Sequence, residues 1–356
     1  MKPFDNNRLS ALSRRRLLGL AGTAGAAALL GRFTLADEHV HEHSPASATA
    51  PERSFVLPER RKLKLAINLN AVCLAPVAVA ESQGFFSKHN LDVEFVNFGN
   101  STEVLLEAIA TGKADAGVGM ALRWLKALEQ GFDVKLTAGT HGGCLRLLTA
   151  ANGGASNLEA LKGKTIGVTD MASPDKNFFS IMLKRHGVDP VRDVEWRQYP
   201  ADLLGTALDK GEVQAVSGSD PFMYRLLKGG DFVELSTNLA EEYGQLSCCV
   251  VGVTGTLARQ DKAAAAALTQ AILEAHSWAA AHPDVVAQDF LKYAVNTSPE
   301  EVSAILKDHT HAHHASGPAF VKEIAYYARD LKDVDVLRPS TDPQKFAESI
   351  YVDVFS

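Results

Sequence analysis

The stretch KLKLAINLNAVCLAPVAVAESQGFFSKHNLDVEFV, residues 62–96, contains the signals that decide the fold. In residues 62–70, leucine or isoleucine alternates with polar or small residues, which is typical of a β-strand. Pro76 then opens a segment that ends at Gly84, and a proline at the start with a glycine at the end predicts a helix. Residues 91–98 predict the next strand. Strand, helix and strand in this order form the unit of a parallel sheet.

The same alternation recurs along the chain. Strands are expected at 114–120, 164–170, 193–199 and 213–219, and helices at 101–112, 173–187, 201–211 and 220–230. The stretches 62–120 and 164–219 therefore resemble each other, and each predicts a mostly parallel sheet with flanking helices. We expect an α/β protein with two such lobes, in which the helical remainder after residue 261 packs on the first lobe.

Two strand-like segments outside these repeats predict where the chain crosses between the lobes. They are CLRLLTA, at 144–150, and SCCVVGVT, at 247–254. With these crossovers as hinges, residues 62–145 and 252–356 form lobe 1 and residues 146–251 form lobe 2. Residues 37–61, which are polar and contain Pro, Ser, Ala and His, are expected to form a flexible linker.

Residues 1–36 have the pattern of an export signal. Their apolar stretch, 17–30, follows three arginines and is too short to span a membrane. The order Ser-Arg-Arg-Arg-Leu-Leu at 13–18 matches the twin-arginine pattern, which addresses folded proteins for export, and a general secretory signal is the alternative. With cleavage after Ala36 or Ala48, the mature protein is expected to be soluble in the periplasm.

The composition excludes some classes of function. The chain has 356 residues, 46% of them hydrophobic, and its formal net charge of -6 gives no basis for nucleic-acid binding. Its four cysteines are too few for a disulfide scaffold, although Cys144 could pair with Cys248 or Cys249 across the crossovers. Such a bridge would stiffen the hinge, so free buried thiols are the favoured prediction.

Segment 62–96 resembles the first unit of the periplasmic substrate-binding proteins of ABC importers for taurine, alkanesulfonates, nitrate and thiamine-pyrimidine precursors. Later segments are similar to the same family in the same order: EAIATGKADAGVGM (107–120), LEALKGKTIGV (158–168), ALDKGEVQAVSGSDP (207–221) and VLRPSTDPQKFAESIYVDVF (336–355). The resemblance implies a two-lobed clamshell of type II that closes on one small molecule. It also implies delivery to a permease and ATPase subunits, with membrane contact only through the permease.

A ligand site is expected between the lobes, because ligands of open α/β sheets bind beyond the carboxyl ends of the strands. Helix N-termini there offer free N–H groups, which suit an anion. The candidate ligand-binding residues are Asn70, Ala71, Cys73, Ser101, Met120, Thr140, His141, Asp170, Ser173, Ser219 and Asp220. Their hydroxyl, amide and backbone donors predict a small organic anion or a polar heterocycle, of the sulfonate, nitrate or pyrimidine type. Arg146 is a further candidate charge partner, and turn or cap roles are the alternative for each residue.

Histidines are concentrated in two clusters. One contains His39, His41 and His43, and the other contains His309, His311, His313 and His314. On a helix, the first and third members of the second cluster would share a face, as would the second and fourth. Either pair could hold Zn, Ni or Cu through imidazole nitrogens, which suggests a metal or metal-chelate receptor as a second hypothesis. An exposed helix end is the simpler interpretation.

Motifs of catalysis are not found in the sequence. It has no P-loop, no G-x-S-x-G and no H-E-x-x-H. His141 and Cys144 could suggest a thiol nucleophile, but a strand or turn would separate their side chains, and a pocket-lining pair is favoured. A third hypothesis is an enzyme like the pyrimidine synthases, which need a lysine for pyridoxal phosphate and a cysteine-rich strand that Cys248 and Cys249 only faintly resemble. We therefore predict a solute-binding protein without a cofactor rather than an enzyme.

Overall fold

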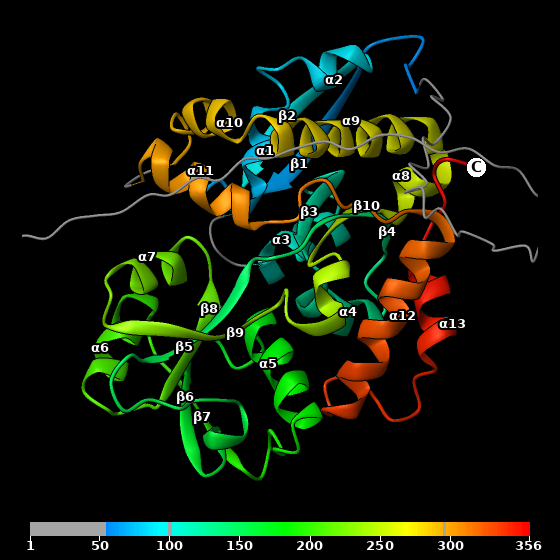
Figure 1. Cartoon of the computed structure of the whole chain (residues 1–356). Coiled ribbons are helices and arrows are strands. Elements are labelled where there is room, and N and C mark those ends of the chain that lie inside the picture. The colour runs from blue at the N-terminus through cyan, green and yellow to red at the C-terminus, as the bar shows by residue number, and fades with distance from the viewer. Residues whose placement is uncertain (1–54, 99–101, 295–296) are drawn as a thin grey trace, which may run out of the picture. The chain divides into compact units, whose positions relative to one another are not determined.

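The computed structural model describes residues 55–98, 102–294 and 297–356. The export signal, most of the linker and the histidines at 39, 41 and 43 lie outside these residues. The described strands form two sheets of five strands each (Figure 1). Among the described residues, no helix has the length and apolar character that crossing a membrane requires.

The first sheet has the strand order β2-β1-β3-β10-β4. Three of its strands are parallel: β1 (Arg61–Ile67), β2 (Leu91–Asn97) and β3 (Ala116–Met120). The strand β10 (Cys249–Thr254) lies antiparallel between β3 and β4 (Val134–His141). Leu63, Leu65 and Ile67 of β1 are buried, whereas Lys62 and Lys64 between them are exposed, as the alternation in the sequence predicts.

The second sheet repeats this arrangement with the order β7-β6-β8-β5-β9. Its parallel strands are β6 (Lys164–Val168), β7 (Val194–Gln198) and β8 (Ala215–Ser219). The strand β5 (Leu145–Ala150) lies antiparallel between β8 and β9 (Phe232–Thr237). The expected α/β fold with two sheets is confirmed. Each sheet is mixed, because one strand, β10 in the first sheet and β5 in the second, runs antiparallel to its neighbours.

The helices follow the expected order, with short 3-10 turns among them. They are η1 (Val72–Leu74), α1 (Ala75–Val79), α2 (Phe85–Lys88), α3 (Thr102–Ala110), α4 (Ala121–Glu129), η2 (Glu159–Leu161), α5 (Pro174–Arg185), η3 (Ala201–Leu203), α6 (Leu204–Asp209), α7 (Phe222–Lys228), η4 (Glu241–Gln245), α8 (Gly255–Gln260), α9 (Lys262–Ala281), α10 (Pro283–Phe290), α11 (Pro299–Asp308), α12 (Gly317–Asp333) and α13 (Pro343–Ile350). As predicted, α9 packs against elements of the expected lobe 1, namely α1, α2 and β4. In addition, α12 packs against both α4 and α5, so it contacts helices that flank both sheets.

Two helix predictions are wrong in detail. The segment from Pro76 to Gly84 is not one helix, because α1 ends at Val79 and Gly84, with φ 78°, precedes α2 instead of ending α1. The histidine cluster from 309 to 314 is not helical, because α11 ends at Asp308. Thr310 there accepts a hydrogen bond from the backbone N–H of Gly142 (2.7 Å) and donates its own N–H to the Gly142 carbonyl (3.3 Å). These tertiary bonds stabilise a non-helical backbone.

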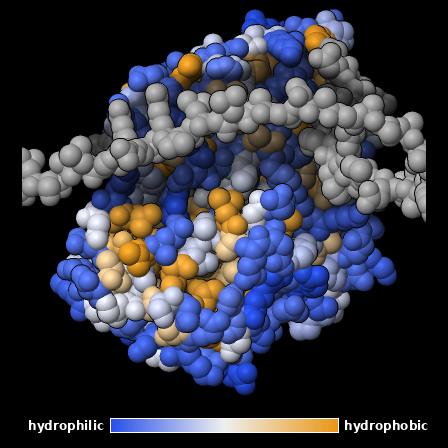
Figure 2. Space-filling model, viewed as in Figure 1, coloured by the Kyte–Doolittle hydropathy of each residue, from blue (hydrophilic) through white to orange (hydrophobic). Residues whose placement is uncertain are grey.

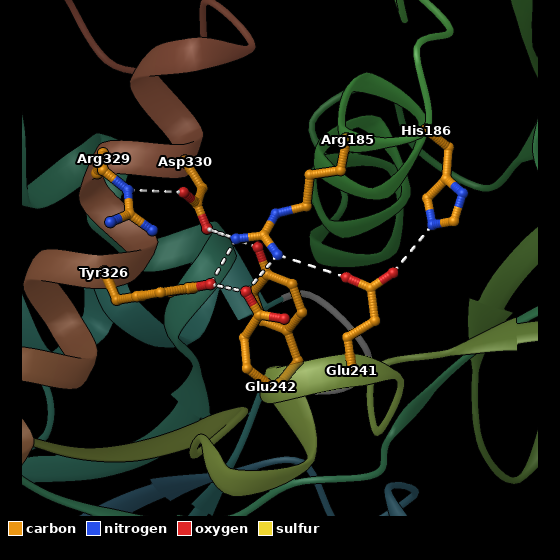
Figure 3. A network of polar contacts seen from close by, with 8 residues as sticks. Arg185, His186, Glu241, Glu242, Tyr326, Arg329 and Asp330 are labelled. Atoms are coloured by element: carbon orange, nitrogen blue, oxygen red, sulfur yellow. Dashed lines mark hydrogen bonds and ion pairs between the residues drawn. The ribbon is translucent and has the colours of Figure 1, made fainter.

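A polar network joins α5 to α12 and η4 (Figure 3). Arg185, the last residue of α5, bonds Tyr326 and Asp330 of α12 and lies 2.5 Å from a carboxylate oxygen of Glu242. Tyr243 donates its hydroxyl to Asp330 at 2.5 Å. The network therefore links a helix that flanks the second sheet to a helix that packs on the first.

Candidate functional site

A pocket of about 620 Å³ lies at the carboxyl ends of parallel strands from both sheets. From the first sheet, Asn68 and Asn70 follow β1, and Met120 ends β3. From the second sheet, Thr169 follows β6, and Ser219 ends β8. The strand order dictates this position, because a parallel strand and the helix that follows it meet at the carboxyl edge of the sheet.

Most of the predicted ligand-binding residues line this pocket. They are Asn70, Ala71, Cys73, Met120, Asp170, Ser173, Ser219 and Asp220. Thr140 and His141 do not line it, because both are fully buried at the end of β4. Ser101 lies outside the described residues.

Several residues that line the pocket were not among the sequence candidates. The most important are Arg123, Arg225 and Asp175. Arg123 lies in the first turn of α4, directly after the end of β3, and this position was the signal that could have identified it. Arg225 lies in α7, and nothing in the sequence distinguishes it from a solvent-facing arginine.

Each of the two arginines forms an ion pair with a carboxylate of the other half of the molecule, where the halves are the two sheets with the helices that flank them. Arg123 of α4 lies 3.2 Å from a carboxylate oxygen of Asp170, which follows β6. Arg225 of α7 lies 2.6 Å from Glu301 of α11. In addition, the Asn177 side chain of α5 donates to the Leu122 carbonyl of α4 at 2.9 Å, and this bond is buried. These contacts hold the two halves together beside the pocket.

Arg146, the further candidate charge partner, does not line the pocket and is paired with three carboxylates instead. Its Nε lies 3.0 Å from both carboxylate oxygens of Asp220, and its other nitrogens pair with Glu234 (2.6 Å) and Asp308 (3.1 Å). Burial opposes the charge of Arg146, but the hydrogen bonds and charge of Asp220 outweigh it and raise the pKa of the guanidinium. Asp220 therefore holds an arginine at the edge of the pocket.

Asp175 is a buried carboxyl in the lining of the pocket. It is buried at the start of α5 and accepts a hydrogen bond from the Ser217 hydroxyl at 2.7 Å. Burial raises the pKa of this carboxyl, because a low-dielectric surrounding disfavours the charged form. Ser173 caps α5, as its sequence predicts, by accepting the Lys176 N–H at 3.3 Å.

A cluster of cysteine and histidine side chains lies behind the pocket. His141 and Cys144 do not point apart as expected, because Nε2 of the ring lies 3.2 Å from the sulfur. Cys144 lies 3.9 Å from the sulfur of Cys249. All four cysteines of the chain are free and buried, which confirms the prediction of unpaired thiols. Cys73 and Cys249 connect this cluster to the pocket, because both also line it.

The structure does not gather the four histidines of residues 309–314 in the way that the predicted metal site requires. Of its four histidines, only His311 joins a group of potential ligands among the described residues, and its partners there are His141 and His276. His313 bonds Glu323 at 3.0 Å, and His314 lies 2.9 Å from the Ser277 hydroxyl. The prediction that these histidines pair on one helix is wrong, because α11 ends at Asp308, before the first of them.

Solved structures of low sequence identity share this fold. The periplasmic aliphatic sulphonate binding protein SsuA from Escherichia coli is similar with a TM-score of 0.68 and 15% identity, over 82% of this chain and 92% of that one. The periplasmic nitrate-binding protein NrtA from Synechocystis PCC 6803 is similar with a TM-score of 0.67 and 16% identity, over 82% of this chain and 86% of that one. Both names describe solute-binding proteins.

The sequence also matches part of a larger transport protein. The bicarbonate transport ATP-binding protein CmpC from Synechocystis sp. (strain ATCC 27184 / PCC 6803 / Kazusa) is 28% identical over 227 residues, which are 59% of this chain. The match spans only 34% of the length of that relative. A family model described as NMT1/THI5 like matches residues 72–286. Since this match extends over more than half of its residues, the chain belongs to the NMT1/THI5-like family.

Proposed function

We propose that this protein is the extracytoplasmic solute-binding component of an ABC importer. It captures one small solute in the pocket and delivers it to the permease, which works with ATPase subunits. The observation that carries this proposal is the pocket itself, which is lined by strand ends of both sheets and bordered by ion pairs between them. A solute that contacts both sides stabilises the closed arrangement, because it binds that state better than the open one.

The lining favours a small organic anion or a polar heterocycle. Arg123 and Arg225 bring two guanidinium groups to the pocket, and guanidinium pairs well with flat oxyanions. Asn68, Asn70 and Thr169 add uncharged side chains that donate hydrogen bonds. Sulfonates, nitrate, bicarbonate and aminopyrimidines are therefore the first solutes to test.

The surface beside the pocket supports a docking role. On the face shown in Figure 2, hydrophobic side chains gather over α7 and β9, and α7 contributes Phe222 and Arg225 to the pocket lining. Val233 of β9 is 43% exposed. In our proposal this face meets the permease, to which the solute is handed over.

Export by the twin-arginine route remains part of the proposal. The motif at 13–18 would send the folded protein to the periplasm. A fusion of residues 1–48 to a reporter tests this: replacement of Arg14 and Arg15 by lysine should block export of the folded reporter. Export that continues unchanged would point to the general secretory route.

A thermal-shift and calorimetric screen tests the solute class. Taurine, longer alkanesulfonates, nitrate, bicarbonate and aminopyrimidines are added in turn to the purified protein, and a true solute should raise the melting temperature. Calorimetry should then give one site per chain. If none of these solutes binds at millimolar concentration, the proposed ligand class is wrong.

A further inference from the structure

The geometry points to a buried binding site for a soft metal cation, of the Zn²⁺ or Cu⁺ type, formed by Cys73, His141, Cys144 and Cys249. The potential ligand atoms of these residues lie within 4.8 Å of one another, and all four side chains are buried. The inference does not depend on the identity of the transported solute.

The spacing of the atoms matches a tetrahedral thiolate site. Zn–S bonds of about 2.3 Å place two sulfurs of a tetrahedron about 3.8 Å apart. The sulfurs of Cys144 and Cys249 lie 3.9 Å apart, and Nε2 of His141 lies 3.2 Å from the Cys144 sulfur. A disulfide needs about 2.05 Å between its sulfurs. Small shifts would therefore place one ion among these groups, with the three-sulfur, one-nitrogen set found in structural zinc sites.

His141 is held in the form that binds a metal. The Thr140 hydroxyl donates to the Cys249 carbonyl at 3.1 Å and lies 3.0 Å from Nδ1 of the ring. Because the hydroxyl proton is used in the first bond, its oxygen accepts the N–H of Nδ1. The proton of the neutral ring is therefore on Nδ1, which leaves the lone pair of Nε2 directed at the sulfur cluster.

The neighbours of the cluster do not oppose a cation. The rings of His276 and His311 stack near His141, with centroid distances of 5.2 and 4.6 Å. Burial lowers the pKa of both imidazoles well below the ordinary value, because a low-dielectric surrounding disfavours the charged form. Nε2 of each ring is buried without a hydrogen-bond partner, which is costly in a folded protein. This pair therefore brings two further unpartnered imidazole nitrogens close to the proposed site.

Cysteine binds a metal as the thiolate, so a bound cation would favour loss of the thiol protons. The pocket offers the path by which an ion could enter, since Cys73 and Cys249 line it.

Metal titration of the purified protein, reduced and kept free of oxygen, tests the inference. Zn²⁺ should bind at one equivalent in competition with a chelator. Co²⁺ should give the sulfur-to-metal charge-transfer bands and strong visible bands of a tetrahedral thiolate site. Cys144→Ser and Cys249→Ser should each weaken Zn²⁺ binding by more than about 100-fold, beyond the usual effect of an outer-shell residue. A parallel titration with Cu⁺ identifies which of the two ions binds more tightly.

Cys248→Ser is the matched control. This thiol is buried and adjacent to Cys249, but it lies outside the group of four ligand atoms. The variant should bind Zn²⁺ like the wild type. If the serine variants fail to fold, X-ray absorption of the zinc-loaded wild type decides, with three sulfur neighbours and one nitrogen neighbour expected. Binding without sulfur neighbours, or no binding at one equivalent, would overturn the inference.

Discussion

The sulfur atoms of Cys144 and Cys249 lie 3.9 Å apart, although the residues lead into strands of different sheets. Cys144 precedes β5 of the second sheet, and Cys249 begins β10 of the first. The two crossings of the chain between the sheets therefore meet at one buried point. In the proposed function, the halves would rotate about these crossings when they close on a solute, so the chemistry of this point would affect that motion.

Thr140 is predicted to act as a positioning residue for His141. Thr140→Val removes the hydroxyl that fixes the ring proton on Nδ1, and we expect Zn²⁺ affinity to fall by about 10- to 100-fold. Thr140→Ser keeps the hydroxyl and should restore affinity. The visible spectrum of the Co²⁺-loaded variants reports ligand geometry, which a loss of stability alone would not change. Equal Zn²⁺ affinity in the valine variant and the wild type would contradict this role.

Arg123 is predicted to bind the solute. A hydrogen bond to a charged group contributes about 1.5–3 kcal/mol, so Arg123→Ala should weaken binding of an anionic solute by about 10- to 150-fold in calorimetry. Asp170→Asn breaks the same ion pair but keeps the guanidinium, and it should change affinity much less. Arg259→Ala is the surface control, because Arg259 pairs with Asp133 and does not line the pocket. The prediction fails if the alanine variant at position 123 binds as tightly as this control.

Arg146 is predicted to stabilise the fold through its buried partner. Arg146→Met leaves the buried carboxylate of Asp220 without its guanidinium, and we expect the free energy of unfolding to fall by about 3–5 kcal/mol. Urea denaturation measures this loss. Adding Asp220→Asn to the same chain removes the uncompensated charge and should recover part of it. A loss below about 1 kcal/mol would contradict the prediction, because the pair would then contribute no more than an exposed ion pair.

His186 is predicted to make stability depend on pH. Hydrogen bonds to Glu159 (2.8 Å) and Glu241 (2.9 Å) raise the pKa of His186 in the folded protein (Figure 3 shows the bond to Glu241). Since the folded pKa lies above the unfolded value of about 6.5, the stabilisation is complete below that pH and is lost as pH rises through the folded value.

The variant His186→Gln isolates this contribution. Wild type should be more stable than the variant at about pH 6, and the difference in unfolding free energy should shrink towards about pH 9. Chemical denaturation at both pH values measures it, and subtraction of the two proteins removes the titration of the other histidines. A difference that grows with pH would have the wrong sign for this pair of bonds.

The amino-acid sequence by itself determined the elements and the class of fold. The alternation in residues 62–70, Pro174 with Ser173 at the start of α5 and the two similar halves are local or repetitive signals, and the structure follows them. The strand ends that form the pocket could also be predicted, because the rule for ligand sites depends only on strand order and direction. Arg225 could not, since its side chain reaches the pocket only through the packing of α7.

Only the tertiary structure decided which histidines and cysteines meet. Spacing in the sequence grouped His309 to His314 on a helix, but contacts with Gly142 hold that segment in a non-helical backbone and bring His311 to His141 and His276. Cys73, Cys144 and Cys249 are far apart in the chain and meet because both crossings and the turn after β1 converge. Local sequence fixes the helices and strands through short-range sterics and polarity, whereas side-chain clusters depend on long-range packing that no short pattern encodes.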